Sequence, residues 1–458
     1  MFRGILAAAL CLIAAALTLL LPSVPSYDPW SWLVWGREVI GLDLRTTTGP
    51  SWKPLPVLLT APYSLAGPIA PDLWLVTARA ATFGAVATAV VLGTRLGGRA
   101  AGVLSGGLLL FSPWLWGATW TGNSEGILIL CVLAAAHRHL AGRQGQAFGL
   151  AVAAGLLRPE AWPFLGLYAI WLLVEDRRRL AWLAGGLAVI PALWLLPELW
   201  GSGSLFRAAE RAQQPGVDAP AMAPHPAFTV TKNAVKLAPL PVLLGLVAWM
   251  GGVLRRRSQV AKILPSLALG GLAGAWVLLV AVMSEFGFSG ISRYLFAPVG
   301  IACVLAGVGL GWAFSDLVKL RTPRFARRAA ALLIVAGALV GAAPHFDGDS
   351  PTVNQLKHEA AVIGELETVV AQAGGERALE ACGPLYASYQ TTPSIAWTLD
   401  RHLEDVSPYA RPPGTVMRAR LLLADPIDPP PNAFAGALRR HDVARTTHWS
   451  VEAACRVR

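Results

Sequence analysis

Six charged side chains stand at the edges of long apolar runs, where charge is costly and usually has a function. They come from five separate segments of the chain, which lie on one side of the bilayer if the apolar runs are membrane spans. This pattern predicts a cavity at one membrane interface that contains a carboxylate base and several cations. The six residues are Asp28, Lys53, Glu125, Arg158, Glu160 and Arg293.

These residue types suit a particular reaction at a membrane surface. Arg and Lys side chains bind phosphate, and Arg does so through two parallel hydrogen bonds. The same cations stabilise a phosphate as it leaves. A nearby carboxylate can take the proton from an acceptor hydroxyl. We therefore expect transfer of a sugar from a polyprenyl phosphate, with Asp28 as the base and with Glu125 and Glu160 as competing bases.

Composition indicates that lipid surrounds much of the chain. Hydrophobic residues make up 55% of the 458 residues and charged residues only 14%, whereas a soluble domain carries about 25% charged residues. Tryptophan is common, with 18 residues, and several stand where a span would meet the lipid headgroups. The sequence therefore predicts an all-α polytopic membrane domain.

Apolar runs broken by charge predict about eleven membrane-spanning helices. The first run is interpreted as a retained helix rather than a cleaved signal peptide. The proline-rich stretch 54–66 is expected to be re-entrant or interfacial and belongs to an outer loop at 24–71. The predicted spans cover 4–22, 72–94, 99–118, 123–140, 145–157, 162–175, 180–199, 238–254, 263–283, 294–315 and 329–344.

Lys and Arg in the connecting loops predict a cytoplasmic N-terminus. With that orientation, every short cytoplasmic loop is basic, as the positive-inside rule requires. The formal net charge of +11 therefore belongs to the membrane part, and no nucleic-acid partner is expected. An odd number of spans places the tail outside, in a plasma membrane. The basic loops include 95–99, 138–143, 177–179, 255–262 and 319–328.

The chain divides into a membrane domain at 1–344 and a tail at 345–458, which is expected to be a small extracytoplasmic α/β domain. The tail is polar and carries 11 Lys and Arg with 14 Asp and Glu. It also contains Cys382 and Cys455, which we expect to form a disulfide because cysteines outside the cytoplasm often pair. Two free thiols remain the alternative.

The motifs around these residues resemble the C-type superfamily of integral membrane glycosyltransferases that use polyprenyl-phosphate sugars. The resemblance is nearest to the branch of the protein O-mannosyltransferases and the aminoarabinose transferase, and it covers roughly 1–345. Asp28 follows the first span, where that superfamily carries a catalytic Asp. Lys53, in W-K-P-L-P at 52–56, matches a phosphate-contacting lysine. Arg293 and Tyr294 open an R-Y-L motif that recurs in the branch.

The resemblance implies a donor site in which Lys53 and Arg293 hold the phosphate, with Arg158 as a further cation. Tyr294, Trp30 and Trp52 are expected to contact the substrate. The acceptor would be a cell-envelope glycan, a lipid or a protein. The branch carries a Glu where this chain has Trp52, so a divalent metal that depends on that Glu lacks its ligand here. The high use of Ala, Arg and Gly suits a bacterium with high GC content, such as an actinobacterium.

Other interpretations remain open from the sequence. Asp28 and Glu125 could cap helices, Arg158 could simply pair with Glu160, and Lys53 or Arg293 could anchor the chain at the interface. A transporter or flippase of lipid-linked substrates would show a two-fold repeat and polar residues near the midplane, and neither is visible in the sequence. A non-catalytic membrane scaffold would leave the charged cluster without a role.

Overall fold

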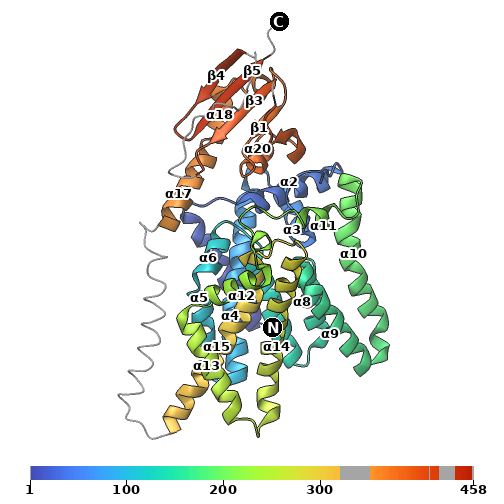
Figure 1. Cartoon of the computed structure of the whole chain (residues 1–458), viewed down its shortest axis with the longest axis vertical. Helices are drawn as coiled ribbons and strands as arrows, with labels where there is room; N and C mark the ends of the chain where they lie inside the picture. Colours follow the sequence, from blue (N-terminus) through green and yellow to red (C-terminus); the bar gives the residue numbers. More distant parts are fainter. Residues whose placement is uncertain (1, 320–350, 412, 422–438, 456–458) are drawn as a thin grey trace.

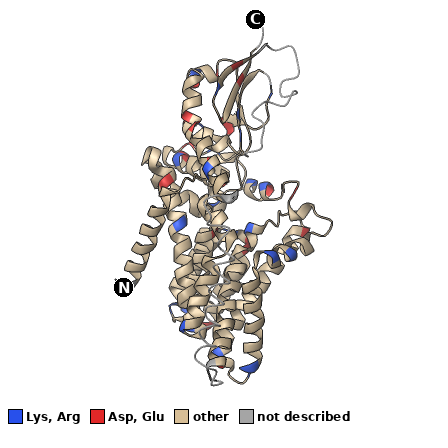
Figure 2. Ribbon diagram, turned by 90° about the vertical axis from the view of Figure 1, so that its left-hand side faces the viewer, with Lys and Arg blue, Asp and Glu red and all other residues tan. Residues whose placement is uncertain are grey.

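The computed structural model describes residues 2–319, 351–411, 413–421 and 439–455. A bundle of helices forms one end of the molecule, and a small sheet domain forms the other (Figure 1). The helices along the middle of the bundle carry few charged residues, and Lys and Arg recur at the end far from the sheet (Figure 2). This distribution is expected of a helical bundle that crosses a bilayer.

Among the described residues, four helices are long and apolar enough to cross a membrane. They are found in 67–97, which contains α4 (Ala70–Gly97), in 177–202 with α10 (Leu180–Ser202), in α14 (Val260–Glu285), and in 292–317 with α15 (Phe296–Lys319). The count rises to six if each of two bent pairs is one span. These pairs are α5 (Arg99–Leu110) with α6 (Pro113–Trp120), and α12 (Pro226–Leu237) with α13 (Leu240–Arg255).

The expected count of about eleven spans is therefore not confirmed, and helix length is the reason. The runs predicted at 123–140, 145–157 and 162–175 form α7 (Glu125–Leu140), α8 (Gln144–Gly155) and α9 (Trp162–Glu175). These helices have 16, 12 and 14 residues, short of the roughly 20 needed for a full crossing. The first run forms α1 (Phe2–Leu17), and the run at 329–344 lies outside the described residues.

Small residues let α15 pack at the centre of the bundle. A side chain at Gly307 would lie 2.3 Å from the backbone nitrogen of Ser105 on α5, and one at Gly309 would lie 2.2 Å from that of Trp249 on α13. Close backbone approach through small residues is the usual way in which membrane helices associate. The start of α15, next to Arg293, is thereby fixed relative to α5 and α13.

The outer loop at 24–71 folds into two helices rather than a flexible connection. They are α2 (Tyr27–Gly41) and α3 (Pro54–Ser64), and the second occupies the stretch expected to be re-entrant or interfacial. Gly36 allows their close contact, because a side chain there would lie 2.7 Å from the hydroxyl of Thr60. Both helices lie between the bundle and the sheet domain (Figure 1).

The tail contains helices and a five-stranded sheet with the order β2-β1-β3-β5-β4. The helices include α17 (Pro351–Gly364), α18 (Leu366–Gln372), α19 (Glu376–Leu379) and α20 (Thr392–Thr398). Strand β1 runs parallel to β2 and β3, whereas β5 runs antiparallel to β3 and β4. The strands are β1 (Leu385–Ala387), β2 (Val406–Ser407), β3 (Gly414–Ala419), β4 (Arg439–Arg445) and β5 (Trp449–Cys455).

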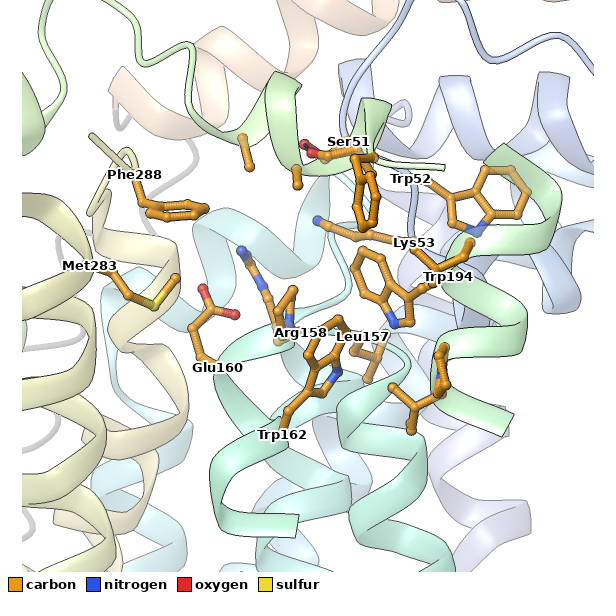
Figure 3. A pocket seen from close by; sticks show the side chains of 18 of the residues that line it. Ser51, Trp52, Lys53, Leu157, Arg158, Glu160, Trp162, Trp194, Met283 and Phe288 are labelled. Carbon is orange, nitrogen blue, oxygen red and sulfur yellow. Dashed lines mark hydrogen bonds between the residues drawn. The ribbon is translucent and has the colours of Figure 1, made fainter. Parts of the chain in front are cut away.

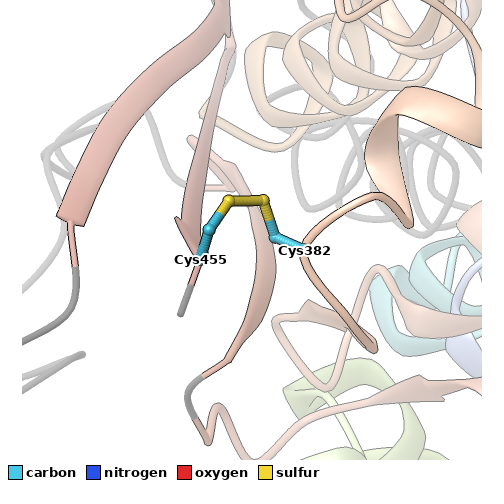
Figure 4. The surroundings of a disulfide bond; sticks show 2 residues. All are labelled: Cys382 and Cys455. Carbon is cyan, nitrogen blue, oxygen red and sulfur yellow. A yellow bond between two sulfur atoms is a disulfide. The ribbon is translucent and has the colours of Figure 1, made fainter. Parts of the chain in front are cut away.

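Cys382 and Cys455 are bonded in the structure, and their Cα atoms lie 4.7 Å apart (Figure 4). The bond joins the turn before β1 to the end of β5. The two cysteines are 73 positions apart in the sequence, so the bond closes a long loop.

Replacing Cys382 with Ser should lower the free energy of unfolding of the tail by up to about 4 kcal/mol, because a loop of this length becomes free in the unfolded chain. Denaturant unfolding of the full chain measures the change, and Cys11→Ser, in α1, serves as the control. Non-reducing peptide mapping should show the linked peptides. Two freely alkylated thiols in protein taken from its membrane would contradict the prediction.

Candidate functional site

Helix starts carry the charged residues of the site. Asp28 lies in the first turn of α2, and Glu125 is the first residue of α7. Both acids benefit from the partial positive charge at a helix N-terminus. Lys53 directly precedes α3, and Arg293 lies in the 3-10 turn Ser292–Leu295 before α15. Arg158 stands in the extended break between α8 and α9, where Pro159 follows.

Five of these side chains form one continuous network. Glu125 Oε1 accepts hydrogen bonds from Arg158 Nη2 and from Arg293 Nε, each at 2.8 Å. Arg293 Nη1 lies 3.1 Å from Asp28 Oδ2, and Lys53 Nζ lies 3.4 Å from the same oxygen. Residues far apart in the sequence therefore meet at one place, as the sequence led us to expect.

The network is largely hidden from solvent. The Glu125 side chain is fully buried, and the side chains of Arg158 and Lys53 are 7% and 10% exposed. A buried charge is costly unless an opposite charge and hydrogen bonds compensate it. Here Glu125 compensates two guanidinium groups, so the loss of this one acid would leave Arg158 without a carboxylate partner in the network and Arg293 with Asp28 alone.

The surroundings of Asp28 and Lys53 lower the pKa of both side chains. A lower pKa favours the charged form of Asp28 and the neutral form of Lys53. Burial raises the pKa of Asp28, but Arg293, Lys53 and Arg158 together lower it more strongly, to about 2. Burial lowers the pKa of Lys53 to about 8, and repulsion from Arg158 acts in the same direction. Asp28 is therefore ionised at neutral pH, while Lys53 loses its charge in mildly alkaline solution.

A cavity of about 540 Å³ opens beside the network. Figure 3 shows Lys53 and Arg158 pointing into it, with Glu160 beside Arg158. Most of its wall is apolar and comes from α9, α10, α14 and the loop that leads into α11 (Arg207–Ala212). Apolar residues of the wall include Trp162, Leu187, Ile190, Trp194, Phe206, Met283 and Phe288.

Glu160 and Tyr294 line the same cavity, but only Tyr294 contacts a cation of the network. Glu160 is buried, and its Oε2 has no hydrogen-bond partner among the described residues. The Tyr294 ring lies under the guanidinium of Arg158, 4.6 Å from ring centre to Cζ, where a cation is attracted to the ring face. Glu160 is thus an acid on the cavity wall without an ion-pair partner in the described part of the chain.

The two tryptophans predicted as substrate contacts are separated. Trp52 lines the cavity, and its indole N–H donates to the carbonyl of Leu193 at 2.9 Å. Trp30 does not line this cavity. It lies in the wall of a second one, between the start of α2 and the tail. The structure therefore brings together every predicted charged residue and Tyr294, but not Trp30.

The loop after α10 contributes residues that sequence reasoning did not single out. Arg207 donates to the carbonyls of Pro50 and Gly49, at 2.8 and 3.1 Å, and lies 3.6 Å from Glu198. It therefore fixes the chain just before Lys53. The one signal in the sequence was the length of the segment 200–237, which connects the predicted spans 180–199 and 238–254.

The acids of the network are poorly placed to act as a set of metal ligands, because Asp28 and Glu125 face cations rather than each other. In the described part of the chain, one group of side chains has the spacing of a metal site, namely Cys382, His441 and Cys455. It lies in the tail, and both of its sulfurs belong to the disulfide.

No family model matches the sequence, and no curated protein sequence matches it. Solved structures do match its fold. ArnT from Cupriavidus metallidurans, bound to undecaprenyl phosphate, aligns over 98% of this chain and 98% of its own, with a TM-score of 0.59 and 15% identity. The apo form of the same protein aligns with a TM-score of 0.56 and 17% identity, over 98% of this chain and 97% of its own.

The chain therefore shares the fold of ArnT. The alignment with ArnT includes the tail as well as the bundle, since it spans nearly the whole length of both chains. An oligosaccharyltransferase from Archaeoglobus fulgidus aligns over 88% of this chain and 64% of its own, with a TM-score of 0.47 and 15% identity. The resemblance to the glycosyltransferase superfamily expected from the motifs is confirmed at the level of the fold.

Replacing Glu125 with Gln should lower the free energy of unfolding by roughly 3 kcal/mol, because the buried guanidinium of Arg158 loses its counter-charge and Arg293 keeps only Asp28. Unfolding in detergent micelles, followed by tryptophan fluorescence, measures the change. Glu210→Gln, at an exposed position of α11, is the matched control and should stay within about 0.5 kcal/mol of the parent. Equal stability of the two variants would show that Glu125 does not hold the network together.

Proposed function

We propose that this protein is a membrane glycosyltransferase that moves a sugar from a polyprenyl-phosphate donor to an acceptor hydroxyl on the outer face of the membrane. One observation carries the proposal. Three cations, Lys53, Arg158 and Arg293, meet two carboxylates beside an apolar cavity, in a fold shared with a protein that was solved bound to undecaprenyl phosphate.

The cavity offers both environments that such a donor needs. The phosphate would lie against Lys53 and Arg158, which point into the cavity (Figure 3). The first isoprene units would contact the apolar wall formed by α9, α10 and α14. An Arg guanidinium can form two parallel hydrogen bonds to a phosphate, whereas a Lys ammonium acts as a point charge.

Charge balance suggests how the phosphate and Asp28 would influence each other. Around the cavity, three cations stand against the acids Asp28, Glu125 and Glu160, so the site is close to neutral before the donor arrives. A phosphate would compete with Asp28 for Lys53 and Arg293. Because these cations lower the pKa of Asp28, their engagement by phosphate would make Asp28 a stronger base.

The proposed step is a single displacement. The acceptor oxygen attacks the anomeric carbon of the donor sugar, and the bond from that carbon to the phosphate oxygen breaks. The acceptor proton passes to Asp28, and the polyprenyl phosphate leaves while Lys53, Arg158 and Arg293 hold its charge. Cations placed in advance around a developing negative charge stabilise it without having to reorganise.

The acceptor is proposed to be a glycan, lipid or protein of the cell envelope. The protein would lie in the plasma membrane with its N-terminus in the cytoplasm and its tail outside. The basic loops support that orientation, since the α13–α14 connection contains 255–257 and lies at the end of the bundle opposite the sheet domain (Figure 1).

Neutralising Lys53 should weaken binding of undecaprenyl phosphate by about 10- to 150-fold, the equivalent of the 1.5–3 kcal/mol of a charged hydrogen bond. The parent protein should also lose affinity as the pH rises through about 8, because Lys53 loses its proton there. The loss should reach up to tenfold per pH unit. Binding titrations between pH 7.5 and 9.5 test both effects, since the phosphate is already a dianion in that range.

In the same titrations Lys53→Gln should show little change with pH, and Lys232→Gln, at an exposed position of α12, should behave like the parent. A pH profile of Lys53→Gln that follows the parent would assign the titration to another group. Unchanged affinity in Lys53→Gln would remove Lys53 from the phosphate site.

Replacing Asp28 with Asn should leave donor binding intact and lower sugar transfer by about 100-fold or more, the usual effect of losing a general base. Single-turnover transfer from a radiolabelled lipid-linked sugar to membrane acceptors measures this. Glu160→Gln is the informative companion, because Glu160 lines the same cavity without an ion-pair partner among the described residues. If Glu160→Gln abolishes transfer while Asp28→Asn retains it, Glu160 is the base.

A further inference from the structure

A second cavity lies where the start of α2 meets the tail. Its volume is about 300 Å³, and its wall combines residues of the first outer loop with residues of α17 and α20 and of the turn before α20. Ligand pockets range over roughly 300–1,000 Å³, so this one suits a short segment of a molecule. Its polar and aromatic lining includes Tyr27, Trp30, Gln355, Glu359, Gln390 and Ser394.

Asp28 lies next to residues of both cavities. Its carboxylate lies 3.4 Å from Lys53, which lines the first cavity. The preceding residue, Tyr27, and the residue two positions further on, Trp30, both line the second. A group bound in the second cavity would therefore lie near Asp28 but against other residues than the donor, as an acceptor must.

The side chains of the second cavity suit sugar hydroxyls. Gln355 Nε2 is engaged with Glu359 Oε1 at 3.0 Å and with the carbonyl of Leu421 at 2.8 Å. The amide oxygen of Gln355, one carboxylate oxygen of Glu359 and the whole amide of Gln390 have no hydrogen-bond partner among the described residues. The oxygens accept hydrogen bonds from hydroxyl groups, and the amide nitrogen of Gln390 can donate one to a hydroxyl oxygen.

Aromatic side chains complete this lining. Trp30 is 94% buried, being 6% exposed, and its indole N–H has no acceptor among the described residues. Tyr27 stacks on Tyr389 of the tail with ring centres 4.2 Å apart. An amphipathic ring offers an apolar face together with a polar edge, which matches a sugar ring with its C–H face and its hydroxyl rim.

The charge of the lining distinguishes the classes of acceptor. No Lys or Arg occurs among the described residues that line this cavity, and Glu359 is the acid there. A phosphorylated or otherwise anionic group would be repelled by Glu359 without a compensating cation. A neutral group rich in hydroxyls meets no such penalty.

We propose that this second cavity is the acceptor subsite and that it binds one or two sugar rings of a neutral glycan, with the indole N–H of Trp30 and the side chains of Gln355, Glu359 and Gln390 as hydroxyl partners. The proposal rests on the glycosyl transfer proposed above and specifies its acceptor. The acceptor hydroxyl would be held beside Asp28, while the phosphate of the donor stays with Lys53 on the other side.

The test uses the full chain in lipid nanodiscs and a panel of neutral octyl glycosides of hexoses and pentoses, in pyranose and furanose forms, with octyl glucuronide as the anionic comparison. Saturation-transfer difference NMR measures their binding. The variant Glu359→Gln/Gln390→Ala removes two hydroxyl partners. Glu367→Gln/Gln372→Ala makes the same two changes at exposed positions of α18 and serves as the matched control. Trp30→Phe removes the indole N–H and keeps an aromatic ring.

At least one neutral glycoside should bind the parent and the control, and it should bind at least tenfold more weakly to Glu359→Gln/Gln390→Ala and to Trp30→Phe. Undecaprenyl phosphate should bind all four proteins equally. The assignment of the acceptor subsite is wrong if no neutral glycoside binds, if octyl glucuronide binds best, or if the variants bind like the control. Undecaprenyl phosphate would still bind in each of these cases. Failure of the parent to bind undecaprenyl phosphate would instead remove the proposed function itself.

Discussion

Glu125 is the constraint on which the rest of the site depends. One buried carboxylate oxygen accepts hydrogen bonds from Arg158 and Arg293, which are 135 positions apart in the sequence. Each guanidinium would be unstable at this depth without a counter-charge. Because Glu125 can pair with both cations only when α7, the α8–α9 break and the start of α15 meet, the network also favours the assembly of these segments.

The same network would keep the proposed phosphate site assembled before a phosphate arrives. Asp28 is the anionic partner of both cations in the structure, at 3.1 Å from Arg293 and 3.4 Å from Lys53. An anionic substrate can therefore exchange with a carboxylate rather than having to attract mobile side chains from water. Preorganised charge of this kind is the main source of stabilisation in reactions that develop negative charge.

Much of this arrangement could be predicted from the sequence, because charge beside an apolar run is informative in a membrane protein. Asp28, Lys53, Glu125, Arg158 and Arg293 were recognised in this way, and the structure joins them. The number of spans was less predictable. Hydropathy cannot tell a short helix held by its neighbours from a complete crossing, as α8 and α9 illustrate.

Contacts between distant segments were also beyond sequence reasoning. Trp30 was expected beside the other substrate contacts, but it follows Asp28 by about half a turn of α2 and lines the second cavity instead. Arg207 gave no periodic or motif signal, since its role depends on backbone carbonyls at Gly49 and Pro50. Such roles come from the path of the chain in space, and side-chain chemistry alone does not reveal them.

The tail holds α2 and the chain that follows it by specific polar contacts as well as by ring packing. Arg37 lies 2.8 Å from Asp400 and donates to the carbonyl of Arg401 at 2.6 Å, and Arg45 lies 2.8 Å from Glu404. The helix that carries Asp28 is therefore held in place by contacts with the tail as well as with the membrane domain. In chimaeras that exchange tails between homologous proteins, a foreign tail would have to reproduce the partners of Arg37 and Arg45 for the membrane domain to keep its own geometry.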